Sequence, residues 1–161
     1  MIGRIAQRLI ELQLVLPPPP LPVANYVPYV RDGRLVQVAG VAPTEPGVST
    51  IVGKVGRELD LAEGRRAARL CALNLLATLK GACDDDLDRV TRVVMVRGFV
   101  NAAEDFEHVP LVIDGASDLL VEVFGSDIGR HARTSIGCAT LPSRAAVELD
   151  ALVSVDANVS Y

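Results

Sequence analysis

The chain contains no tryptophan and few other aromatic residues. Of its 161 residues, three are tyrosine and three are phenylalanine, although 50% are hydrophobic. The core must therefore be built from aliphatic side chains, and rings are too scarce for the stacking platforms that bind single-stranded nucleic acid. A chain of this length suits one domain with a single hydrophobic core.

An excess of positive charge is also missing. The sequence has 16 Lys and Arg against 20 Asp and Glu, a formal net charge of −4. Proteins that bind nucleic acid usually have a basic footprint. The local exception is the group Arg65, Arg66 and Arg69, which we expect on one solvated face of a helix. The composition therefore disfavours a nucleic-acid partner.

Long hydrophobic runs and clustered metal ligands are absent as well. No run approaches the ~20 apolar residues of a membrane span, and no secretory signal is recognised. The three cysteines, Cys71, Cys83 and Cys138, form no CxxC pair. We therefore expect reduced thiols in a cytoplasmic protein. Two histidines, His108 and His131, are too few for a recognisable zinc site.

Two short stretches resemble ligand sites without meeting their requirements. Asp84, Asp85 and Asp86 are consecutive, so their carboxylates point in different directions, and a solvated turn is expected instead of a metal site. Gly53-Lys54 is followed by Val55, where a phosphate-binding loop needs Ser or Thr. The sequence therefore predicts neither a metal nor a cofactor.

The first 20 residues differ from the rest. Residues 2–16 place Ile5, Leu9 and Leu12 at helical spacing, and the prolines 17–20 end that helix. The proline run favours an extended conformation and is interpreted as a stiff connector, with a recruitment motif as the alternative. We therefore divide the chain into an N-terminal helix with a connector, 1–20, and a single domain, 21–161.

Strand and helix signals alternate in the domain. A hairpin is expected over 26–39 around Asp32-Gly33, a short strand over 50–52, and a strand over 87–100 whose residues 93–96 are apolar on both faces. A helix is expected over 60–81 and a second over 105–124, interrupted near Pro110 and near Asp114-Gly115, with Ser117 as a second N-cap. With strands 134–140 and 147–155, this order predicts an α+β fold with two main helices on one face of a mixed sheet.

The last two strands carry the candidate site. Leu141-Pro142-Ser143 breaks the chain between them, so we expect the strands to lie side by side and to bring Arg133 close to Glu148. A guanidinium can bind a substrate carboxylate through two hydrogen bonds, and a carboxylate can accept a proton from water. The alternative is a buried structural ion pair.

The same stretch carries a family resemblance. The run A-R-T-S-x-G-x-A-x-L-P, from Ala132, followed by A-V-E-L-D-A resembles the C-terminal signature of the reactive intermediate deaminase family, called RidA or YjgF-like and formerly endoribonuclease L-PSP. Tyr26, Gly33 and Gly40 match the family at its spacing. His131 departs from the pattern, and a polar contact that family members supply from a helix falls on Pro110.

The resemblance implies a chorismate-mutase-like fold, a homotrimer and ligand clefts between subunits. It also implies hydrolysis of enamines and imines such as 2-aminoacrylate to 2-keto acids and ammonia, without a cofactor. Arg133 would bind the substrate carboxylate with help from the amides of Gly40 and Ser135. Tyr26 would line one side of the cleft, and Glu148 would hold the attacking water.

Other functions remain open. A trimer of this kind could bind small 2-keto acids or related carboxylates without turnover, and the older family name points to an endoribonuclease or translation inhibitor. A serine hydrolase is disfavoured because Arg133 occupies the first glycine position of a G-x-S-x-G motif around Ser135.

Overall fold

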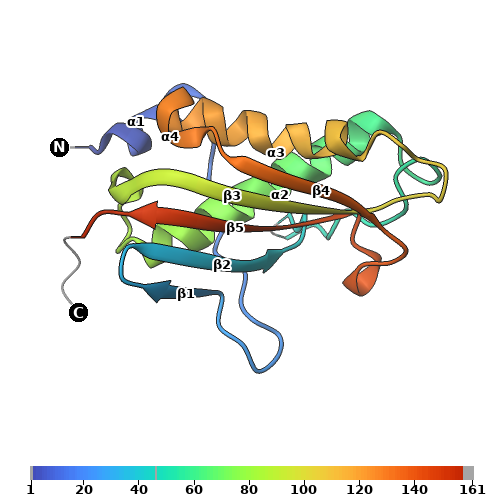
Figure 1. The fold of residues 1–161 in the computed structure, drawn as a ribbon, viewed down its shortest axis with the longest axis horizontal. Helices are drawn as coiled ribbons and strands as arrows, with labels where there is room; N and C mark the ends of the chain where they lie inside the picture. The colour runs from blue at the N-terminus through green and yellow to red at the C-terminus, as the bar shows by residue number, and fades with distance from the viewer. Residues whose placement is uncertain (1, 46, 158–161) are drawn as a thin grey trace.

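A computed structural model describes residues 2–45 and 47–157 of the chain. It shows one five-stranded sheet with helices packed on one face (Figure 1). The elements are α1 (Arg4–Glu11), β1 (Tyr29–Asp32), β2 (Leu35–Val41), α2 (Leu61–Ala82), β3 (Val90–Asn101), α3 (Val109–Phe124), α4 (Ser126–Gly129), β4 (Ala132–Cys138) and β5 (Val147–Val155), with short 3-10 helices at Leu87–Arg89 and Pro142–Arg144. The predicted α+β class, with its mixed sheet and two main helices on one face, is confirmed.

The strands are ordered β1-β2-β5-β3-β4. All neighbours are antiparallel except β3 and β4, which are parallel. The prediction that the last two strands lie side by side is therefore wrong, because β3 lies between β4 and β5. A break in the sequence marks where a strand ends, but not which strand pairs with the next.

Local signals place β1, β2 and β5 well. The Asp-Gly hairpin forms with Gly33 at φ 58°, a conformation that glycine adopts without steric cost. β5 alternates buried and half-buried residues from Val147 to Val155, as its sequence predicts. The strand expected over 50–52 is reduced to isolated bridges from Thr50 to Thr44 and from Val52 to Ala145.

α2 begins at a complete capping box. The Asp60 carboxylate accepts a hydrogen bond from the Glu63 amide at 2.8 Å, and the Glu63 carboxylate accepts one from the Asp60 amide at 2.8 Å. Both bonds satisfy amides that have no partner within the helix. The predicted start of this helix is confirmed.

α3 is one uninterrupted helix, so the predicted breaks are wrong. Pro110 lies in its first turn, where a missing amide hydrogen costs nothing. Gly115 lies where α3 crosses α2, because a Cβ there would be 2.2 Å from the Arg65 carbonyl oxygen. Ser117 is inside the helix instead of capping it. The glycine that suggested a break is therefore a requirement of helix packing.

The acidic turn before β3 holds the N-terminal helix in place. The two Asp88 carboxylate oxygens accept the amides of Arg4 and Ile5 at 2.6 and 2.7 Å. Gly3, at the N-cap of α1, has no side chain to do so. Ile5 is fully buried in the same core as the sheet.

In residues 2–45 and 47–157, no group of three or more acidic, His or Cys side chains is arranged to hold a metal.

We expect Asp88→Ala to lower the free energy of unfolding by about 1 kcal/mol, the usual cost of losing a helix cap. For a chain of this size that corresponds to a fall in Tm of roughly 2–4 °C, measurable by circular dichroism at fixed protein concentration. Asp105→Ala is the matched control, because Asp105 is exposed in the loop before α3. Equal Tm values for the two variants would contradict the capping role.

Across the ranges that the structure describes, no helix is both long and apolar enough to cross a membrane.

Candidate functional site

Arg133 and Glu148 lie on opposite faces of the sheet. Arg133, on β4, donates to residues of α3 and so faces the helices. Glu148 lies two residues from Asp150, whose carboxylate pairs with exposed Arg97 at 2.8 Å on the open face. Two strand spacings of roughly 4.8 Å also separate β4 from β5. Within one chain, the two predicted catalytic groups are therefore not brought together.

Glu148 lies in a cavity of about 570 Å³ on the open face, near the start of β5. The other lining residues are Pro20, Leu21, Val23, Tyr26, Ala39, Gly40, Val41, Ala42, Thr44, Thr50, Pro142, Ser143 and Ala145. Three predicted site residues, Tyr26, Gly40 and Glu148, thus share one cavity although they come from a loop and two strands. Its walls are mostly apolar, and Glu148 is the one ionisable carboxylate among the lining residues.

Gly40 leaves room for the carboxylate. It lies in a bulge of β2, where the pairing with β5 shifts between Val38 and Val41. A Cβ at this position would be 2.2 Å from Oε1 of Glu148. The absence of a side chain therefore lets the Glu148 carboxylate lie directly against the β2 backbone.

The pKa of the Glu148 carboxyl is raised above its usual value, first by burial and second by the negative charge of Asp150. A carboxylate of raised pKa accepts a proton more readily, which suits a group that must take a proton from water. The electrostatics of this cavity therefore agree with the predicted role of Glu148.

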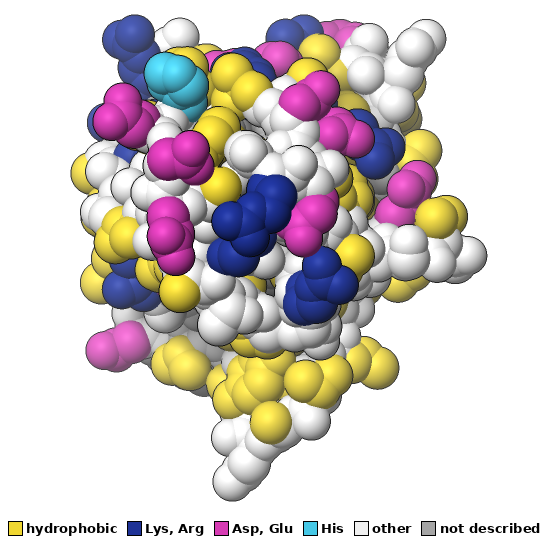
Figure 2. Space-filling view, turned by 90° about the vertical axis from the view of Figure 1, so that its right-hand side faces the viewer, with side chains coloured by type: hydrophobic (Ala, Val, Ile, Leu, Met, Phe, Trp, Pro, Cys, Tyr) yellow, Lys and Arg dark blue, Asp and Glu magenta, His cyan; other side chains and the backbone are white. Residues whose placement is uncertain are grey.

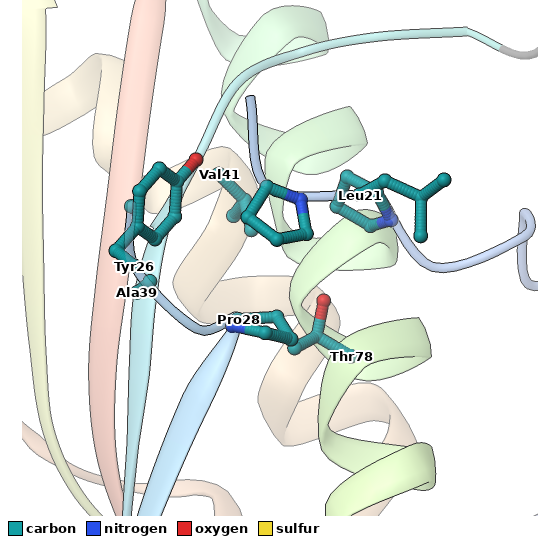
Figure 3. Close-up of a pocket in the computed structure, with 9 residues that line it drawn as sticks. Leu21, Tyr26, Pro28, Ala39, Val41 and Thr78 are labelled. Atoms are coloured by element: carbon teal, nitrogen blue, oxygen red, sulfur yellow. The ribbon is translucent and has the colours of Figure 1, made fainter. Parts of the chain in front are cut away.

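The proline-rich segment forms one wall of this region, which its sequence does not reveal. Leu21, Pro28 and Tyr26 surround a small hollow that continues to Thr78 on α2 (Figure 3). The hollow and the Glu148 cavity share Tyr26 and Gly40. Pro20, the last residue of the segment interpreted as a connector, also lines both.

Arg133 lines a different cavity, of about 290 Å³, with Ser117, Val121, Arg130 and His131. Its Nη1 donates to Asp114 Oδ1 at 2.8 Å and to Ser117 Oγ at 3.0 Å, and Nη2 donates to the Pro110 carbonyl at 3.3 Å. These bonds use three of the five guanidinium N–H groups. Two donors, including Nε–H, have no partner in the described chain and are free for a ligand.

The polar helix contact that falls on Pro110 was expected to be missing or rebuilt, and α3 does contact Arg133 here. Pro110 supplies its carbonyl oxygen in place of a side chain, and Asp114 and Ser117 add further contacts. The spacing of Asp114 and Ser117, three residues apart on a helix, could have indicated a shared face. Nothing in the sequence indicated that this face lies against Arg133.

Ser135 lines neither cavity. It pairs with Gly98 of β3, two residues beyond Arg133 on the same side of β4. Its hydroxyl is buried and has no hydrogen-bond partner in the described residues. Its expected role, donation of its backbone amide to a ligand, stays a prediction.

Comparison with known proteins identifies relatives over nearly the whole chain. Residues 6–153 match the family model described as "YjgF/chorismate_mutase-like, putative endoribonuclease". Protein TCP17 of Trypanosoma cruzi is 44% identical over 154 residues, which cover 96% of each protein.

Two solved structures share the fold closely. The protein Atu1372 of Agrobacterium tumefaciens, of unknown function, is 45% identical, with a TM-score of 0.85 over 94% of this chain and 93% of that one. A protein of Shewanella oneidensis described as a "putative endoribonuclease" is 31% identical, with a TM-score of 0.89 over 94% of this chain and 99% of that one.

Proposed function

The chain belongs to the YjgF/chorismate mutase-like family, and we propose that it is an enamine and imine deaminase that converts 2-aminoacrylate-type intermediates to 2-keto acids and ammonia. The observation that carries this proposal is the pair of complementary half-sites. One presents an arginine with free donors, and the other holds a half-buried glutamate of raised pKa in a largely apolar cavity.

The reaction needs two functions from the protein. Arg133 binds the substrate carboxylate through its free N–H groups, which fixes the position of the imine carbon. Glu148 accepts a proton from the water that attacks this carbon. Glu148 then returns this proton to the nitrogen of the tetrahedral adduct. The carbon–nitrogen bond breaks as the hydroxyl gives its proton to Glu148 and becomes the carbonyl, so that ammonia leaves and the 2-keto acid remains. A protonated imine is already electrophilic, so these steps require no cofactor.

The half-sites of one chain must be completed by another copy. The open sheet face carries half-buried apolar side chains that no helix within residues 2–45 and 47–157 covers, among them Met95, Phe99 and Leu152. Hydrophobic side chains also gather where the loop before β1 projects, at the lower end of Figure 2, and Leu21 and Val23 are 84% and 94% exposed. Apolar surface of this kind is typical of subunit interfaces. We infer a homotrimer whose clefts join Glu148 of one chain to Arg133 of the next.

Binding without turnover is the alternative, because a small 2-keto acid would use Arg133 in the same way. A ribonuclease has less support from the structure. Arg65 pairs with Asp118 at 3.0 Å, and Arg69 pairs with Glu122 at 2.8 Å. Two of the three arginines expected as a basic group on α2 are thus paired with acids of α3, which weakens this group as a footprint for phosphates.

The test is release of ammonia and pyruvate from 2-aminoacrylate generated in situ by a dehydratase. We expect acceleration over the spontaneous rate, at least a hundredfold loss of that acceleration in Arg133→Ala, and a similar loss in Glu148→Gln. Asp105→Ala again serves as the control. No acceleration, together with pyruvate binding that depends on Arg133 alone, would favour the binding protein instead.

A further inference from the structure

A continuous chain of hydrogen bonds leads from the backbone to Arg133. His131 Nδ1 lies 2.7 Å from the Gly129 carbonyl oxygen, and its Nε2 lies 3.0 Å from Ser117 Oγ. Ser117 Oγ in turn lies 3.0 Å from Nη1 of Arg133. These hydrogen bonds join the end of α4, strand β4 and the middle of α3, so they fix the guanidinium of Arg133 relative to three elements.

The direction of each bond follows from which atoms can donate. A carbonyl oxygen only accepts, so Nδ1 of His131 carries a hydrogen. In the neutral imidazole, Nε2 is then an acceptor and receives the hydrogen of the Ser117 hydroxyl. Arg133 only donates, so Ser117 Oγ accepts from Nη1. Neutral His131 therefore gives every member of the chain a complementary partner.

A proton on His131 removes the acceptor on Nε2. The Ser117 oxygen has two lone pairs and can accept from both Nε2 and Nη1, but the Ser117 hydroxyl hydrogen then loses its acceptor on His131 and turns to another group. The imidazolium would also stand beside Arg130 and Arg133, which line the same cavity. The nearest acid in the network, Asp114, is shared by Arg133 at 2.8 Å and Arg65 at 3.6 Å and is thus already engaged.

We propose that His131 and Ser117 are positioning residues for Arg133, and that neutral His131 holds the guanidinium in the orientation that binds a substrate carboxylate. The inference rests on the proposed function, because it assumes that Arg133 binds the ligand. Protonation of His131 then weakens carboxylate binding without touching the group that activates water.

The pKa of His131 agrees with this assignment. Burial lowers it below the usual 6.5, the Gly129 carbonyl raises it, and the charge of Arg133 lowers it. The folded protein thus favours the neutral ring more than the unfolded chain does. This contribution to stability is complete above about pH 6.5 and is lost as the pH falls below that value.

The experiment measures pyruvate affinity by NMR titration between pH 5 and pH 8 in the full-length protein. We expect the Kd of the wild type to rise about threefold to tenfold toward low pH, the effect of one weakened charge-assisted hydrogen bond. The pH at the midpoint of this change in Kd should equal the pH at which the NMR signal of the His131 ring titrates. That signal is easily assigned because the chain has only two histidines.

Three variants isolate the contribution of His131. H131Q keeps an acceptor for Ser117 but cannot take a proton. It should bind pyruvate at every pH as the wild type does at pH 8, without the rise in Kd that follows protonation of His131. Any remaining pH dependence then belongs to Glu148. H131L, which offers no acceptor, should bind about threefold to tenfold more weakly than the wild type at pH 8 and should approach the wild type at low pH, where His131 has lost its acceptor too. H108Q is the matched control, because the His108 side chain makes no capping bond to α3.

Failure of the inference is distinguishable from failure of the proposed function. A pH profile of H131Q that matches the wild type, or wild-type affinity in H131L at pH 8, would overturn the positioning role while Arg133→Ala still abolishes binding. Pyruvate binding that survives Arg133→Ala would instead overturn the proposed function, and the inference with it.

Discussion

We expect an equimolar mixture of Arg133→Ala and Glu148→Gln chains, each inactive alone, to recover about one quarter of the wild-type deaminase activity once subunits are exchanged. In a closed ring, each cleft joins an arginine of one chain to a glutamate of the next. With random assembly, a cleft has an intact Arg133 half the time and an intact Glu148 half the time. The structure motivates this test because the two side chains face opposite sides of one sheet.

The measurement is ammonia release after the two variants are unfolded and refolded together, with mass spectrometry of the intact assembly to establish mixing. The control mixes Arg133→Ala with a chain that carries both substitutions, which can form no intact cleft and should stay inactive. If mixed assemblies form without any activity, both groups act from the same chain, and the proposed cleft between subunits is wrong.

The largest loss of stability is expected from Gly115→Ala. A Cβ at this position would lie 2.2 Å from the Arg65 carbonyl oxygen and 3.2 Å from the Arg65 Cα. The obstacle is backbone of α2, which cannot rotate away as a side chain would. The two helices must separate, and overpacking of this kind costs about 3 kcal/mol. We expect Tm to fall by roughly 6–12 °C, measured calorimetrically at fixed protein concentration.

Gly81→Ala is the matched control for this prediction. Gly81 lies in the last turn of α2, and a Cβ there would meet nothing within 4 Å. Alanine is favoured over glycine in a helix by about 1 kcal/mol, so this variant should be as stable as the wild type or slightly more so. A similar loss in both variants would show that the α2–α3 contact does not limit stability.

The sequence predicted elements wherever a short-range signal was sufficient. The capping box at Asp60 and Glu63 gave the start of α2, and the alternation from Val147 gave β5. The Asp-Gly pair gave the first hairpin. The prediction from sequence was wrong where one residue type can play two structural roles. Gly115 was interpreted as a helix break because glycine is a poor helix former, but the close crossing of α2 and α3 requires it.

The candidate site was predicted residue by residue but not as an arrangement. Arg133, Glu148, Tyr26 and Gly40 were all singled out from residue type and family resemblance, and the structure places the last three around one cavity. The network around His131 was not predicted. His131 had been considered as a departure from the family pattern and as one of two histidines too few for a zinc site, and hydrogen bonds between residues 14 apart leave no periodic signal.

The sequence by itself determined the fold class and the family, because helix caps, alternation and motif spacing act over a few residues. Only the tertiary structure decided that β3 separates β4 from β5 and that Arg133 and Glu148 face opposite sides of the sheet. The physical reason is that strand order is set by which long-range pairing buries the most apolar surface beneath α2 and α3. The amount of apolar surface buried depends on the whole core and cannot be read from any single segment.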